Sequence, residues 1–97
     1  MRNEQDLSVD INRARLAQDF INNPLFIEGL TVLKASTLDK FESLNSNQVK
    51  EMVDCNKMLK VIDEFETRFY QIISTGNAAL SALDDIKQHK KEMNNER

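Results

Sequence analysis

An apolar stripe between Met52 and Ile86 constrains this chain more than any other feature of its sequence. Residues between the apolar positions are almost all polar, so one helical face is apolar and the other is solvated. The stripe follows heptad spacing, which is typical of a long, coiled-coil-like helix. Its rows are Cys55, Ile62, Phe69, Gly76, Leu83 and Met58, Phe65, Ile72, Ala79, Ile86, widened by Met52, Leu59, Ile73 and Leu80.

A helix from about residue 46 to about residue 88 would be roughly 60 to 65 Å long, at about 1.5 Å per residue. An amphipathic helix is not stable through propensity alone, because most of its stability comes from covering its apolar face. The stripe must therefore be covered by another part of this chain or by another chain.

The residues Asn22, Asn23 and Pro24 separate two shorter helices that precede the long one. Asn23 is a favoured N-cap, and Pro24 suits the first helical position, where its missing N–H costs nothing. We expect the second helix to end near Leu44. The first helix, from about Leu7 to Ile21, is apolar on two faces, and we expect Asp6 or Ser8 to cap it.

The link between the second helix and the long helix is short. If Asn45 is the N-cap, Gln48 completes a capping box, and Leu44 and Val49 can form a hydrophobic staple. Two amphipathic helices with so short a link are expected to lie antiparallel. With 2 Gly and 1 Pro in 97 residues, we predict an all-α fold: an antiparallel αα-hairpin with a long second helix and a short N-terminal helix, coiled-coil-like and oligomeric.

We expect one helical-hairpin domain over residues 7–88, between a flexible N-terminus at 1–6 and a flexible tail at 89–97. Gly76 leaves two alternatives within that domain. It could end one helix, with Asn77 capping a new one. We favour a continuous helix, because the heptad phase is unchanged across Gly76, and a small residue there could let another helix approach closely.

The second helix is too short to cover the whole stripe. A helix over Pro24 to Leu44 spans about 30 Å and reaches only to about Phe69. The rest stays uncovered unless the Leu7 to Ile21 helix runs along it. We therefore predict a homo-oligomer that uses the far half of the long helix, with Phe65 to Ile73 central to the main apolar contact. The predicted interface comprises Phe65, Phe69, Ile72, Ile73, Leu80, Leu83 and Ile86.

No motif for catalysis, cofactor binding or metal binding occurs in the sequence. There is no Gly-rich phosphate loop, HExxH, CxxC or nucleophile elbow. Cys55 is the only cysteine and lies on the apolar stripe, where we expect a buried, inert thiol. His89 is the only histidine and has no partner ligand nearby. We predict a non-enzymatic protein without cofactors.

A net charge of −3 gives no general attraction for nucleic acids or anionic membranes. No stretch approaches the ~20 apolar residues of a membrane span, and Met1 to Asp10 does not resemble a signal peptide. We expect a cytoplasmic protein without a membrane partner. A DNA-binding accessory remains the alternative function, and its basic residues would be Arg13, Arg15, Lys87, Lys90 and Lys91.

The segment Asn23-Pro24-Leu25, followed by Leu30 and Leu33 and by a late Gly76 in the long helix, resembles small helical-hairpin proteins of tailed bacteriophages. The resemblance covers about residues 16–86, although Phe26 and Ile27 replace expected leucines. It implies virion assembly or DNA packaging, with other phage assembly proteins as partners and the host cytoplasm or the virion as location. A small terminase-like packaging subunit is one specific form of the DNA-binding alternative.

The sequence thus leaves two main classes of function. The first is a self-associating structural or adaptor protein, and the second is the DNA-binding accessory. Secreted helical hairpins are a third, weaker class, and the turn at Asn45 to Asn47 lacks the Trp-x-Gly of one such group.

Overall fold

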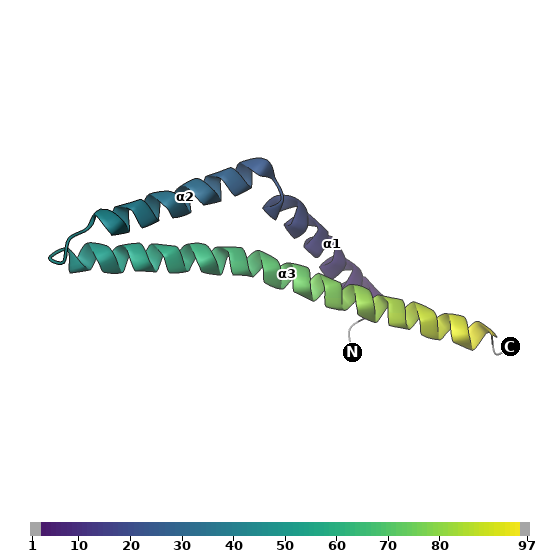
Figure 1. Ribbon diagram of the computed structural model, residues 1–97. Helices are drawn as coiled ribbons and strands as arrows, with labels where there is room; N and C mark the ends of the chain where they lie inside the picture. Colours follow the sequence, from purple (N-terminus) through teal and green to yellow (C-terminus); the bar gives the residue numbers. More distant parts are fainter. Residues whose placement is uncertain (1–2, 96–97) are drawn as a thin grey trace. The chain divides into compact units, whose positions relative to one another are not determined.

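The computed structural model describes residues 3–95 and consists of helices. Along the chain these are α1 (Glu4–Ile21), α2 (Pro24–Ser43) and α3 (Val49–Asn95) (Figure 1). No strand occurs within residues 3–95. The predicted all-α class is confirmed, as are the break before Pro24 and the turn after Leu44.

The chain forms two compact units. The first, here called the α1–α3 unit, contains residues 3–19 of α1 and its N-terminal cap together with residues 69–95 of α3. The second, the α2–α3 unit, is Phe20–Arg68 and contains α2, the turn and the first part of α3.

The break between α1 and α2 forms for the predicted reason. The Asn23 side-chain oxygen accepts hydrogen bonds from the backbone N–H groups of Leu25, at 2.9 Å, and Phe26, at 3.3 Å. These bonds satisfy donors that the first turn of a helix leaves without intrahelical acceptors. Pro24 follows at the first helical position, where it needs no hydrogen bond. α2 therefore starts at a defined residue.

The turn before α3 uses the predicted residues in a different geometry. The Asn45 N–H donates to Gln48 Oε1 at 3.0 Å, which is the expected pairing. However, the Asn45 side chain accepts from Asn47 N–H, and the Gln48 carbonyl accepts from Met52 N–H, both at 3.0 Å. Gln48 thus occupies the N-cap position, and α3 begins at Val49. The expectation that Asn45 caps a helix from residue 46 was wrong, because Asn45 closes a separate turn.

α1 begins earlier, and α3 ends later, than the sequence indicated. Asn3 caps α1, since its side chain accepts from Asp6 N–H at 2.9 Å and its carbonyl accepts from Leu7 N–H at 3.1 Å. Asp6 and Ser8 lie inside the helix, so their expected capping role was wrong. α3 continues to Asn95. The expected flexibility of residues 1–6 and 89–97 stays a prediction, and residues 1–2 and 96–97 lie outside the described residues.

Gly76 lies in the interior of α3, which is one α-helix from Val49 to Asn95. The preference for a continuous helix over a C-cap at this residue is confirmed. Glycine costs about 1 kcal/mol relative to alanine inside a helix, so its presence here calls for a local reason. That reason lies in the contact between α1 and α3.

Candidate interaction surfaces

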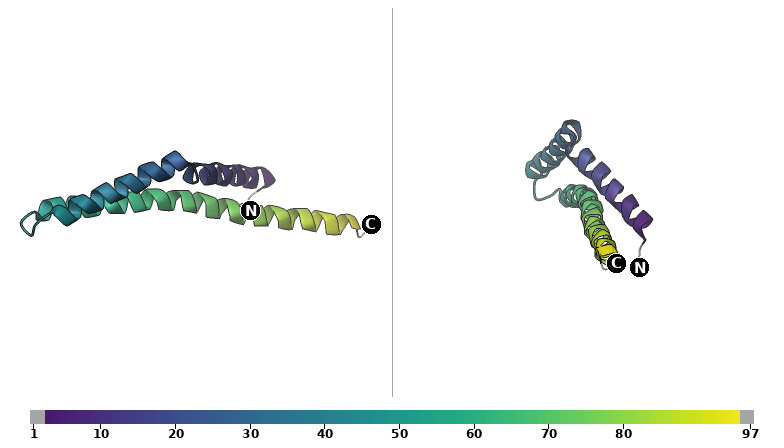
Figure 2. Two further views of the ribbon diagram at one scale, coloured as in Figure 1. Left: turned by 45° about the horizontal axis from the view of Figure 1, so that its top comes forward. Right: turned by 90° about the vertical axis from the view of Figure 1, so that its right-hand side faces the viewer.

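The α1–α3 unit is built on a close approach of two helices at Gly76. A Cβ atom placed on this residue would overlap the Ala14 side chain and lie 2.8 Å from the Asp10 carbonyl oxygen. Figure 2 shows α1 beside this part of α3. Ala14, Ala17 and Ala79 are all at least 95% buried. Small side chains therefore bring the two backbones together, and no larger residue fits at position 76 without moving α1.

This contact changes the reasoning behind the predicted interface. The far half of α3 was expected to lack a complete partner in its own chain, whereas α1 packs against it at Gly76 and Ala79. Leu80 remains 47% exposed and Phe65 48% exposed. The other predicted interface residues, which are Phe69, Ile72, Ile73, Leu83 and Ile86, are partly exposed. Their role between chains stays a prediction.

The far ends of the α1–α3 unit are joined by an ion pair between Glu4 and Lys90. The Lys90 ammonium group donates a hydrogen bond to the Glu4 carboxylate, and this bond and the positive charge hold the Glu4 pKa below its ordinary value. Arg15 donates to the Asn12 side chain at 2.8 Å. Two of the basic residues considered for DNA contact are thus engaged within the chain.

The α2–α3 unit is held together by larger side chains. The rings of Phe20 and Phe65 both pack at a tilt against that of Phe26, with centroids 4.4 Å and 6.2 Å away from its centroid. Lys34 forms an ion pair with Glu66. Cys55 and Ile62 are each only 4% exposed. The expected burial of the lone cysteine is confirmed, but few apolar residues of this unit are as well covered.

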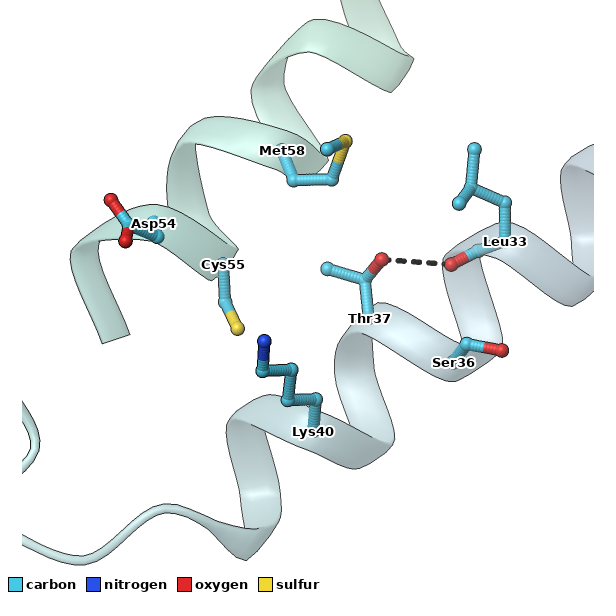
Figure 3. Close-up of a pocket in the computed structure, with 7 residues that line it drawn as sticks. All are labelled: Leu33, Ser36, Thr37, Lys40, Asp54, Cys55 and Met58. Carbon is cyan, nitrogen blue, oxygen red and sulfur yellow. Dashed lines mark hydrogen bonds between the residues drawn. The ribbon is translucent and has the colours of Figure 1, made fainter. Parts of the chain in front are cut away.

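An open groove of about 300 Å³ separates α2 from α3 beside Cys55 (Figure 3). Leu33 and Met58 give it an apolar lining, and Lys40 and Asp54 lie at its polar end. The Thr37 hydroxyl donates a hydrogen bond to the Leu33 carbonyl oxygen at 2.8 Å, so its proton already has an acceptor within α2. Sequence reasoning missed this groove, because its walls come from two helices whose relative rotation no local pattern specifies.

Apolar side chains remain exposed on both helices of this unit. On α2, Leu25 is 76% and Val32 57% exposed, and on α3, Val61 is 58% and Met58 46% exposed. No large side chain among residues 3–93 has less than 2% of its surface exposed. In this unit the apolar surface is thus extensive and the covered core is small.

Within residues 3–95, no group of three or more His, Cys, Asp or Glu residues could hold a metal ion. No helix in that range is both long and apolar enough to cross a membrane. No protein-family model, curated protein or solved structure matches this chain.

Proposed function

We propose that this chain is a non-enzymatic helical interaction protein that associates with itself and acts in assembly or as an adaptor. The exposed apolar surface of the α2–α3 unit carries the proposal. Contiguous apolar patches beyond a few hundred Å² are rare on monomeric proteins and usually mark interaction sites. In this proposal, α2 and the first part of α3 form a helical hairpin whose free faces receive another subunit.

The composition of α2 supports this role. Leu25 and Val32 lie seven residues apart and are both exposed, while Phe26 and Leu30 are partly covered. A helix that is apolar around its circumference is usually buried on more than one side. Covering a side chain such as Leu25 fully contributes about 1.5 to 3 kcal/mol. Covering a few such residues would offset the translational, rotational and side-chain entropy that is lost on association.

The biological setting that we propose is the assembly of a tailed bacteriophage. Its support is the resemblance carried by Asn23-Pro24-Leu25 and the late Gly76. The DNA-binding alternative has less support, because Lys90 and Arg15 are engaged within the chain. Binding of duplex DNA that weakens steeply with added salt would favour that alternative.

Light scattering over a series of protein concentrations tests self-association. We expect a mass that rises to at least twice the 11.2 kDa of one chain. A mass that stays at 11.2 kDa at millimolar concentration contradicts the proposal.

Aspartate substitutions then locate the interface. Val61→Asp places a charge on the exposed face of the α2–α3 unit. The double variant Leu80→Asp, Leu83→Asp places two charges on the predicted interface in the far half of α3. Burying an unpaired charge is costly, so the variant that lowers the mass identifies the covered half. Thr67→Asp, at an exposed polar position of α3, is the matched control.

A further inference from the structure

Three exposed apolar residues of α3 in the α2–α3 unit, Met58, Val61 and Phe65, lie on one line with charged residues at its two ends, while the exposed Val49 and Val53 lie off this line. We call this line the α3 seam: Asp54, Met58, Val61, Phe65 and Arg68, all of them exposed. The spacing of four, three, four and three residues keeps them on one helical face, as in a coiled-coil seam. The seam is thus acidic at one end, apolar in the middle and basic at the other end.

This order is self-complementary when reversed. Val61 is equally distant in sequence from Asp54 and Arg68, so a second copy rotated about a two-fold axis at Val61 places each acid opposite the other copy's base. In that arrangement the exposed Lys57 of each copy also lies near the exposed Glu64 of the other copy, so these charges attract each other. A parallel pairing would oppose like charges at both ends. A two-fold interface requires this kind of self-complementary patch.

The groove beside the seam has room for a side chain of the second copy. In the reversed register, Phe65 of one copy stands level with Lys57 of the other, next to Asp54 and Met58, which line the groove (Figure 3). Four residues spaced like Asp54, Lys57, Met58 and Val61 form the hole that accepts a knob in coiled-coil packing. A cavity of about 150 Å³ holds a benzene molecule, and the groove has about 300 Å³.

We infer that two copies of this chain pair antiparallel along the α3 seam, with Val61 at the two-fold axis and Phe65 of each copy in the groove of the other. The inference rests on the proposed self-association and specifies its geometry. Asp54 and Arg68 form ion pairs across the interface at both of its ends.

Charge reversal at the two ends of the seam tests the pairing without touching the core. Asp54→Arg and Arg68→Asp, as separate proteins, each oppose like charges at both ends, and we expect dimerisation measured by sedimentation equilibrium to weaken about tenfold. An equimolar mixture of the two variants restores opposite charges at both ends, so the mixed dimer should recover wild-type affinity. Lys60→Glu, off the seam, is the control and should change little.

The possible results separate the inference from the proposed function. If the wild-type chain associates but neither single variant weakens it, or the mixture stays as weak as its components, the seam is wrong and self-association stands. If the wild-type chain is monomeric at every concentration, both fail.

Cysteine cross-linking tests the direction of the pairing. Val61→Cys places the thiols of the two copies beside the axis, whereas Asp54→Cys places them about 21 Å apart along the helix. Under mild oxidation we expect a 61–61 disulfide, identified by peptide mass, and none at 54–54. A 54–54 disulfide, or equal yields from the two variants, would overturn the antiparallel arrangement. Wild-type protein, which carries only the buried Cys55, sets the background.

Discussion

The two helix contacts of α3 differ in the size of the side chains that make them. Against α1, the contact uses Gly76 and alanines such as Ala14, and the backbones approach so closely that a methyl group does not fit. Against α2, it uses phenylalanines and leaves a groove and exposed apolar residues such as Val61. Small residues close the contact with α1, whereas the large residues on α2 and α3 leave apolar surface exposed, and it is this surface that we propose a second copy covers.

The difference matters for how each contact responds to mutation. The close crossing of α1 and α3 does not tolerate added volume, because protein interiors are packed as densely as crystals and neighbouring atoms cannot move aside without strain. An open groove tolerates added volume but loses stability when one of its few covered side chains is removed. The following predictions concern the free energy of unfolding, measured by urea denaturation at one fixed protein concentration because association would shift it.

The largest effect is expected in the α2–α3 unit at Ile62, which is 4% exposed. Ile62→Ala should lower the free energy of unfolding by about 2 to 5 kcal/mol, since it removes buried methyl groups and leaves a cavity. Thr67→Ala, at an exposed position of the same helix, should change it by less than about 0.5 kcal/mol. Similar losses for both variants would show that this contact has no core.

The two glycines test the close crossing of α1 and α3, because Gly76 lies in it and Gly29 does not. Gly76→Ala should lower the free energy of unfolding by about 1 to 2 kcal/mol, because the added Cβ displaces α1 and this strain exceeds the gain in helix propensity. Gly29→Ala should raise it by up to about 1 kcal/mol, because nothing lies within 4 Å of the added Cβ. Two changes of the same sign would mean that α1 and α3 do not approach as described.

The contrast between the two contacts also explains what the sequence could predict. Asn23 and Pro24 act through bonds to their nearest neighbours, so the break was predictable. The continuity of α3 followed from a heptad phase that Gly76 does not change. The α1 contact was only one of the alternatives that the sequence left open, because alanines such as Ala14 and Ala79 give weak hydrophobic periodicity and only the close approach shows their role. The groove depends on how two helices are rotated, which no local pattern encodes.

A smaller effect is expected at the cap that separates α1 from α2. Asn23→Ala removes the acceptor for the Leu25 and Phe26 N–H groups. The free energy of unfolding should fall by about 1 kcal/mol. Asn22→Ala, one residue earlier, should leave it nearly unchanged. If both variants lose the same amount, the hydrogen bonds to Asn23 do not stabilise the start of α2.

The smallest effect is expected at the surface pair Glu4 and Lys90, which lies at the far end of the close contact. The Glu4 pKa is lowered in the folded state, mainly by the hydrogen bond from Lys90 and then by its charge. The pair should therefore stabilise the fold above the ordinary pKa of glutamate and lose this effect as the pH falls through the lowered value. Wild type and Glu4→Gln should thus differ slightly at neutral pH and converge in acid. A difference that grows in acid would reverse the sign of this linkage.

Amide hydrogen exchange at two protein concentrations tests most directly whether the α2–α3 unit is the one that a second copy covers. We expect the amides of residues 54–68 to exchange more slowly at the higher concentration, where the α3 seam is covered. Residues 69–86, against which α1 packs within the chain, should exchange at the same rate at both concentrations. Exchange that is independent of concentration in both segments, or slowing confined to residues 69–86, would contradict this account.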